Sequence, residues 1–546
     1  MIYLGKYKFL KMIKSAWRIY NIFYKQKDIL LILFSVSILF VVLWSSNKGF
    51  VFSDAAYYNF HFKDHLETIN TSNWHFIWRL FNTSNLIIDQ IIITLLNGIT
   101  SFFLGFTFSK VFNFSKPYII GLLAFCAQFC LGAPIGLSPC YVTLNAVNFN
   151  LISIFFLRYY AYRSKKDFFL VGFFAALIPF IMITNILFLP YLLFAMISLK
   201  ILDRNIVFMC SGFILGLCSY FFFAQSPSEF IHGFYKAMAY IKYDKSHGSG
   251  DMFYWVINIF IELKWIFTLI MVDLIQSKYF KNKYLSFLTL SLLVILIIAC
   301  LNYSLRNPFN LFYTEIFYVI FIWFFYKSIK SLHKTDILFT ITFVSIPFFA
   351  AIGTDVSFFI RATFYYPYIL LPLVYITYKN QNILWKSTLY VLFLITSVNF
   401  FTYPFRNSWA GYKIVDQKLA FKVADFGPDL YLDAHHINRI NEVKSFIQRK
   451  ENVIPSSIAD WGLILFNKAN PPMVLFRINP YILENIKSKE LDEIILLENK
   501  KEEFDLNNLR RALNLDKYSC TLKDTTHYRI YFYSKTNLTP NILNSE

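Results

Sequence analysis

The sequence contains few charged residues, and this scarcity excludes most classes of soluble protein. Asp, Glu, Lys and Arg make up 16% of the 546 residues, whereas soluble globular chains carry about 25%. Hydrophobic residues reach 57%, aromatic residues reach 20%, and the mean hydropathy is +0.47. This composition indicates an integral membrane protein whose apolar surface contacts lipid.

Gly, Pro and Cys are also scarce. The chain has 17 Gly, 17 Pro and 7 Cys, with no collagen-like period, no Pro-rich tract and no CxxC or Cys/His spacing. Fibrous, disordered and disulfide-rich secreted classes are therefore excluded, and the cysteines predict no metal centre. Neither a GxGxxG nor a Walker A motif is present, so nucleotide binding is not predicted.

The net charge of +19 is concentrated in the apolar part of the chain. Residues 1–403 hold 32 Lys and Arg against 15 Asp and Glu, whereas residues 404–546 hold 20 against 18. Basic residues between apolar segments indicate which side of a membrane a loop occupies. We therefore interpret the excess as a topology signal and expect no nucleic-acid partner.

About thirteen apolar segments approach the length of roughly 20 residues that a helix needs to cross a membrane. Seven basic residues precede the first segment, and basic loops alternate with less basic ones. This alternation predicts a cytoplasmic N-terminus and an extracytoplasmic C-terminus. The predicted spans are 29–45, 86–108, 118–135, 141–159, 168–184, 185–200, 206–224, 253–274, 284–301, 311–326, 336–352, 364–378 and 384–403.

Residues 1–403 therefore form a predicted transmembrane domain, and its first external loop, residues 46–85, is large. In this loop Trp74, Trp78 and Phe81 share one helical face. An aromatic face of this kind is expected of a helix that lies on the membrane surface.

Residues 404–546 have a different pattern. A helix-like segment begins at Ile437 and is followed by a strand-like segment at 472–478. Helix-like segments at 484–494 and 505–513 then alternate with the apolar run at 494–499 and a closing pair of strand-like segments at 518–524 and 526–535. Alternation of helical and strand patterns predicts a small α/β domain, placed outside the cytoplasm by the charge pattern. The predicted fold class is thus a polytopic α-helical membrane protein with a small C-terminal α/β extracytoplasmic domain.

Asp54 is the first acidic residue after the first predicted span. It lies in the string FVFSDAAYY, so Tyr57 and Tyr58 follow it closely. An aspartate at the outer interface, flanked by aromatic residues, is suited to act as a general base on a lipid-carried substrate, with the two tyrosines positioning that substrate. The same aspartate is equally suited to cap a helix that begins at Ala55.

These features together resemble the GT-C class of glycosyltransferases that use polyprenyl-phosphate sugars, such as the protein O-mannosyltransferases and the lipid A aminoarabinose transferases. The resemblance rests on the SDAAYY string, the large first external loop, the number of spans and the extracytoplasmic tail. The segments RATFYYPYILLP at 361–372 and ENVIPSSIADWGLILF at 451–466 are similar in style. The resemblance implies an inverting sugar transfer in which Asp54 is the base.

The phosphate leaving group of such a donor needs cations at the outer interface. Arg361 is the strongest candidate, because it lies in a short external loop with Tyr365 and Tyr366 beside it to order a lipid headgroup or stack on a sugar. An arginine there is equally suited to snorkel toward the headgroups or to pair with Asp355. The other candidate phosphate-binding residues are Arg306, Lys236 and Lys242.

The sequence does not favour a metal. Members of the class usually carry paired acids in the first loop, whereas Asp54 is followed by Ala55 and the segment 132–142 has no acid. A divalent cation would therefore lack its carboxylate ligands. His61 and His65 stand one helical turn apart without a third ligand in a recognised spacing. We assign no cofactor and expect a metal-independent transfer, with weak dependence on a divalent metal as the alternative.

The resulting prediction is a membrane glycosyltransferase of the bacterial inner (cytoplasmic) membrane that serves polysaccharide biosynthesis in the cell envelope. It would move a sugar from a polyprenyl-phosphate donor to an envelope glycan, lipid or protein acceptor on the outer face, in contact with membrane lipids. Two alternatives stay open. The first is an O-antigen polymerase, a class that usually relies on arginine-rich external loops. The second is a transporter or flippase of lipid-linked glycans, which needs a polar path between its spans.

Overall fold

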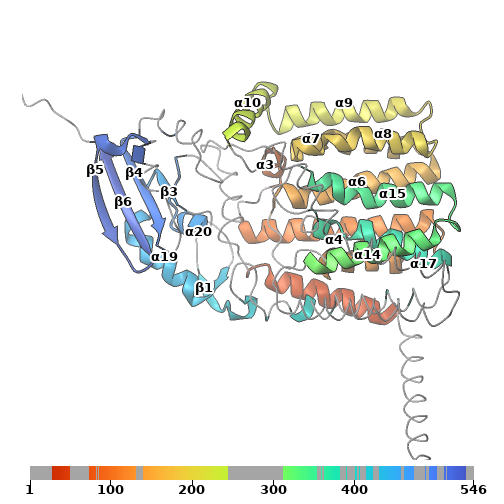
Figure 1. Cartoon of the computed structure of the whole chain (residues 1–546), viewed down its shortest axis with the longest axis horizontal. Coiled ribbons are helices and arrows are strands. Elements are labelled where there is room, and N and C mark those ends of the chain that lie inside the picture. The colour runs from red at the N-terminus through yellow and green to blue at the C-terminus, as the bar shows by residue number, and fades with distance from the viewer. Residues whose placement is uncertain are drawn as a thin grey trace, which may run out of the picture.

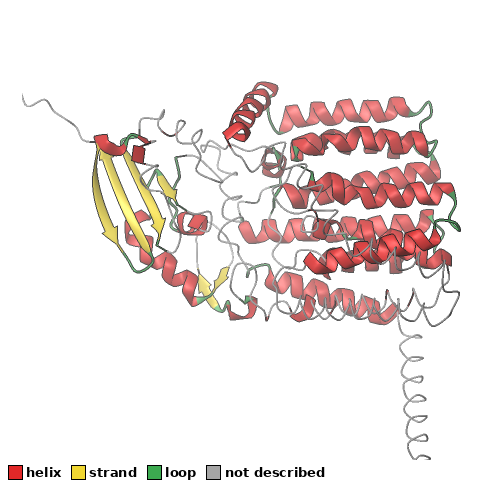
Figure 2. Cartoon of the chain, viewed as in Figure 1, coloured by secondary structure: helices red, strands yellow, loops and turns green. Residues whose placement is uncertain are grey.

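A computed structural model describes most of the chain. The described residues are 28–48, 73–81, 85–130, 139–243, 311–352, 362–380, 413–421, 430–456, 460–472, 491–500 and 513–535, with single positions between them. This part is mostly helical, and its strands gather at one end of the molecule (Figure 1, Figure 2).

Four helices of the described part are long and apolar enough to cross a membrane. They are Asp28–Ser45, α4 (Leu86–Val111), α9 (Ile206–Phe223) and α15 (Lys334–Ala351). The prediction of a helical membrane chain is supported at this level.

Helices also occupy six further predicted segments. A short 3-10 helix, η1 (Ile183–Leu187), separates two of them near the connection expected at Thr184. The predicted spans at 253–274 and 284–301 lie outside the described residues, as does most of 384–403. The six helices are α5 (Pro117–Cys130), α6 (Tyr141–Tyr162), α7 (Lys165–Ile181), α8 (Phe188–Ser198), α14 (Leu311–Ser328) and α17 (Pro367–Asn380).

Glycines allow α7 and α9 to pack backbone against backbone. A Cβ atom added to Gly172 would lie 1.9 Å from the Met209 carbonyl oxygen, and one added to Gly212 would lie 1.9 Å from the Phe169 carbonyl oxygen. Gly212 and Gly216 stand one helical turn apart, the spacing typical of close helix pairs in membranes.

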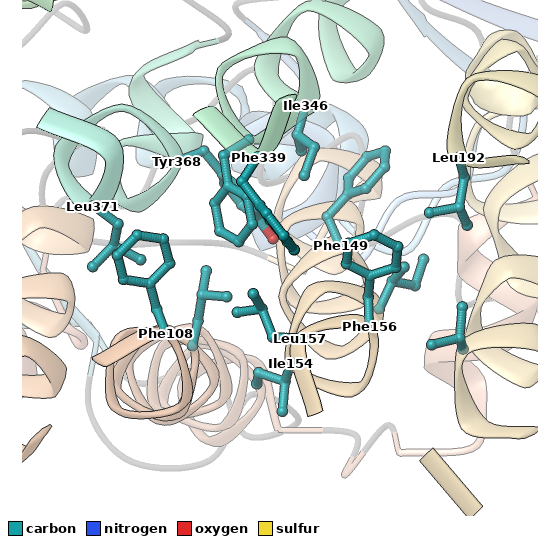
Figure 3. Packing of buried hydrophobic residues seen from close by; sticks show 14 of the residues in the cluster. Phe108, Phe149, Ile154, Phe156, Leu157, Leu192, Phe339, Ile346, Tyr368 and Leu371 are labelled. Atoms are coloured by element: carbon teal, nitrogen blue, oxygen red, sulfur yellow. The ribbon is translucent and has the colours of Figure 1, made fainter. Parts of the chain in front are cut away.

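Aromatic side chains fill the centre of the bundle. Figure 3 shows Phe108 of α4, Phe149 of α6, Phe339 of α15 and Tyr368 of α17 in one cluster, with Leu192 of α8 nearby. All five are at most 3% exposed. Large rings bury much apolar area per residue, so this cluster holds five helices together.

The C-terminal residues form a small α/β unit, here called the tail unit (the described residues from 413 to 535). Its sheet has the order β3 (Val453–Pro455), β4 (Glu493–Asn499), β6 (Tyr528–Lys535) and β5 (Tyr518–Asp524). Strand β3 runs parallel to β4, and the other pairs are antiparallel. The segments at 494–499, 518–524 and 526–535 correspond to β4, β5 and β6, whereas the strand predicted at 472–478 lies almost entirely outside the described residues.

Two helices pack on this sheet, α19 (Ala434–Ile447) and α20 (Trp461–Phe466). The helix predicted from Ile437 corresponds to α19 but begins earlier, at Ala434, because Asp433 caps it: the Asp433 carboxylate accepts from the His436 amide at 2.9 Å. A short hairpin, β1 (Leu419–Phe421) with β2 (Leu430–Leu432), was not predicted.

The tail unit lies beyond one end of the helical bundle (Figure 1). Leu86, the first residue of α4, belongs to the hydrophobic core of the tail unit. The Tyr431 amide of β2 donates to the Asn47 carbonyl at 2.9 Å, which links the tail unit to the chain leaving the first helix. We call this end of the bundle, marked by Asn47 and Leu86, the tail-facing end.

Candidate functional site at the tail-facing end

Five of the nine predicted site residues lie outside the described residues: Asp54, Tyr57, Tyr58, Arg306 and Arg361. The other four are Lys236, Lys242, Tyr365 and Tyr366. The candidate site is therefore built here from these four and from the described residues next to Asp54 and Arg361 in the sequence.

One hydrophobic cluster at the tail-facing end joins distant parts of the chain. It contains Val42 from the helix that precedes Asp54 and Ile414 from the tail unit. Phe364, which follows Arg361 closely, packs against the same cluster. The chain before Asp54, the chain after Arg361 and the beginning of the tail unit therefore share one apolar core.

The short helix α3 (Trp74–Arg79) completes this cluster and corrects an expectation. Trp74 and Trp78 are both 0% exposed and pack in the cluster, whereas Phe81 is 56% exposed. The prediction that the two tryptophans face the membrane surface is wrong, because α3 turns them onto the ends of the bundle helices. A hydrogen bond from the Asn73 amide to the Phe180 carbonyl at 2.9 Å fixes α3 against α7.

Polar side chains of the bundle hold the segment after Arg361. The Gln128 side-chain amide donates to the Phe364 carbonyl at 3.2 Å, and the Asn145 amide donates to the Tyr365 hydroxyl at 3.2 Å. Tyr365 is 1% exposed and Tyr366 is 0% exposed. Direct contact of these two rings with a headgroup or sugar does not fit their burial, whereas a role in holding the segment does.

Lys236 and Lys242 both lie on α10 (Pro227–Tyr243), which stands apart from the bundle at the tail-facing end (Figure 1). The Lys236 side chain is partly buried, and the backbone of Lys242 is helical. The two candidate cations are thus carried by one helix, between the predicted spans 206–224 and 253–274.

A capping box fixes the start of α10. The Ser226 amide donates to the Glu229 carboxylate at 2.9 Å, and the Glu229 amide donates to the Ser226 hydroxyl at 3.2 Å. The hydrogen bonds from Ser226 lower the pKa of Glu229, and the positive charge of Arg79 on α3 adds to this effect. The negative charge of Glu229 is thus stabilised mainly by Ser226 at the start of α10.

Lys48 is a cation that the sequence analysis missed. Its ammonium group lies 4.2 Å from the centre of the Trp44 ring and 5.3 Å from the centre of the Tyr431 ring. Burial lowers the pKa of Lys48 from its usual value of 10.5. Trp44 and Lys48 stand one turn apart at the end of a span, so the sequence could have identified them as a pair at the membrane interface. The contact with Tyr431 could not be predicted, because Tyr431 belongs to the tail unit and is distant in the sequence.

Asp89, the acid nearest the start of α4, serves the local fold. Its carboxylate accepts from the Thr83 amide at 3.0 Å and the Thr83 hydroxyl at 2.9 Å, while Asn85 caps the helix. Among the described residues, no group of three or more His, Cys, Asp and Glu side chains is arranged to hold a metal ion.

The described residues define a helical fold with four candidate membrane-spanning helices among them and a small sheet unit docked on one end. No protein-family model matches the chain, and no curated protein is significantly similar to it.

Proposed function

We propose that the chain is an inverting membrane glycosyltransferase that uses a polyprenyl-phosphate sugar. One observation carries the proposal: Val42, Phe364 and Ile414 share one hydrophobic cluster at the tail-facing end. Described residues that precede Asp54 and follow Arg361 in the sequence thus share one core with the tail unit. The resemblance of the SDAAYY string to the GT-C class gives these two residues their roles.

In this proposal Asp54 removes the proton from the acceptor hydroxyl as its oxygen attacks the anomeric carbon. The bond between that carbon and the phosphate oxygen breaks, and polyprenyl phosphate leaves with its negative charge. Arg361 stabilises this charge, because an arginine bonds phosphate through two parallel N–H groups. Arg306, Lys236 and Lys242 are additional phosphate-binding candidates, and Tyr57 and Tyr58 position the sugar.

The same proposal includes the finer topology. About thirteen spans cross a bacterial inner membrane, the N-terminus is cytoplasmic, and residues 404–546 form the extracytoplasmic domain. A lipid-linked donor would then meet its acceptor between the membrane surface and the tail unit. The acceptor is an envelope glycan, a lipid or a protein.

The test is mass analysis of the envelope glycans of the native host. A deletion strain is complemented with the wild-type protein, with Asp54→Asn and with Asp64→Asn, a matched change in the same loop, at equal membrane levels. We expect the deletion and Asp54→Asn strains to lack one sugar and the Asp64→Asn strain to retain it.

Other outcomes would point to another function. Full rescue by Asp54→Asn removes this residue as the base. Shortened polymers with every sugar present would indicate a polymerase. Accumulation of complete lipid-linked glycans in the membrane would indicate a transporter or flippase.

A further inference from the structure

Helix α9 exposes an apolar surface along its length. Four of its apolar side chains are largely exposed: Val207 (63%), Ile214 (60%), Phe222 (82%) and Phe223 (65%). Only 17% of the residues of this helix are buried. Its hydropathy and length are those of a membrane span. A surface this large and apolar fits lipid rather than water.

Helix α10 follows α9 in the chain and also exposes apolar side chains. Ile231, Phe234, Tyr235 and Met238 are 54%, 40%, 69% and 50% exposed. Residues spaced by three and four positions lie on one face of a helix, so these four side chains form a single stripe. His232, beside the stripe, is exposed and polar.

The position of α10 relative to α9 is fixed by contacts at its start. The capping box of Ser226 and Glu229 begins the helix, and the Phe230 ring packs at 5.3 Å from Phe180 of α7 and 5.9 Å from Phe221 of α9. A Cβ atom added to Gly233 would meet nothing within 4 Å. The helix is thus anchored at its first turn and stands away from the bundle after it.

α10 cannot cross a membrane by itself. It has 17 residues and contains Glu229, His232, Lys236 and Lys242, whereas a span needs about 20 mostly apolar residues. Its first turn packs on the end of α9, where the Phe230 ring lies 5.9 Å from Phe221, so the medium that covers α9 reaches the start of α10.

We propose that α10 is an interfacial helix that lies in the headgroup region of the membrane at the tail-facing end. The stripe of Ile231, Phe234, Tyr235 and Met238 enters the acyl boundary, as apolar faces of amphipathic surface helices do. Lys236 lies on the other side of α10, away from the stripe and toward the headgroups, where its charge favours anionic lipids. This inference does not depend on sugar transfer.

The test measures what surrounds the stripe in the full-length protein. The natural cysteines are replaced, and single cysteines are introduced as Tyr235→Cys, Met238→Cys and, as the matched control, His232→Cys. Each variant receives a nitroxide label and is placed in nanodiscs of phosphatidylethanolamine and phosphatidylglycerol. Collisions with oxygen, which concentrates in lipid, are compared with collisions with a water-soluble nickel chelate.

We expect the labels at 235 and 238 to favour oxygen and the label at 232 to favour the chelate. Equal chelate access at all three positions would mean that the stripe faces water and would overturn the proposal. Access by neither reagent at 235 and 238 would mean that protein covers the stripe, which also overturns it.

A second measurement keeps the natural cysteines. A photoreactive phenylalanine analogue replaces Tyr235 or His232, and the nanodiscs are illuminated. A phospholipid adduct that forms at 235 and is weaker at 232 supports the interfacial position. An adduct at 235 that links only protein segments contradicts it.

Discussion

Arg439 connects three elements of the tail unit, and its removal gives a sharp test of the structure. Its guanidinium donates to the Asp460 carboxylate at 2.5 Å and to the Tyr528 hydroxyl, which in turn donates to Asp460 at 3.0 Å. Asp460 is 0% exposed and the Arg439 side chain is 14% exposed. Burial raises the pKa of Tyr528, and the charge of Asp460 adds to this, so the tyrosine stays a neutral donor.

The change Arg439→Ala leaves the buried Asp460 carboxylate without its cation. Removing one partner of a buried ion pair costs about 3–5 kcal/mol. The same sheet offers a matched control, because Arg529 pairs with Glu498 at 3.7 Å and is 47% exposed. A pair with a solvent-exposed arginine at this distance contributes only about 0–1 kcal/mol. Glu498 also accepts a hydrogen bond from the Tyr531 hydroxyl at 2.8 Å, which Arg529→Ala does not remove.

Hydrogen exchange of the β4 and β6 amides in the full-length protein measures the difference. Since every 1.4 kcal/mol corresponds to tenfold, Arg439→Ala is expected to speed exchange at least about 100-fold and Arg529→Ala about fivefold at most. The double change Arg439→Ala with Asp460→Ala should recover part of the loss, because the unpaired carboxylate is gone. Equal, small effects of the two single changes would refute the reasoning.

Three further outcomes are expected. Gly172→Ala should lower the thermal unfolding temperature of the protein, because its Cβ would meet the backbone of the neighbouring helix. Gly233→Ala has open space around its Cβ, so the unfolding temperature should stay the same or rise, since alanine favours the helix by up to about 1 kcal/mol. Tyr365→Phe removes the acceptor of the buried Asn145 amide and should cost about 1–3 kcal/mol in denaturant unfolding. Burial and the charges of neighbouring side chains lower the pKa of His435 from 6.5. The unfolded chain then binds more protons, so stability should fall as the pH drops through and below 6.5, and His435→Gln should flatten this dependence in thermal scans.

Local pattern was enough to predict most of the elements. The apolar runs locate α4, α9 and α15 within a few residues, and the alternating strings locate β4, β5 and β6. These signals depend on residues close in sequence, which is why they are readable without a structure. The start of α19 was misplaced because a capping aspartate, Asp433, outweighed the apolar period that begins later.

Contacts between distant segments could not be predicted in this way. Trp74 and Trp78 have the composition of an interfacial face, yet they pack on Val42 and Ile93, which belong to other helices. An exposed aromatic face and a buried one have the same spacing, so periodicity does not tell whether lipid or protein covers it. For the same reason the burial of Tyr365 had no signal in its own segment.

The tail unit also shows why a boundary in the sequence need not be a boundary of the core. The composition changes near Tyr403, but Leu86 and Ile87 of α4 are 5% and 3% exposed within the hydrophobic core of the tail unit. Burying one such side chain contributes about 1.5–3 kcal/mol, so the first turn of α4 is part of what stabilises the tail unit. Any displacement of the tail unit from the bundle would expose these two side chains and break the hydrogen bond between Tyr431 and Asn47. Because α4 is itself a candidate span, these contacts fix the position of the tail unit relative to the end of the bundle.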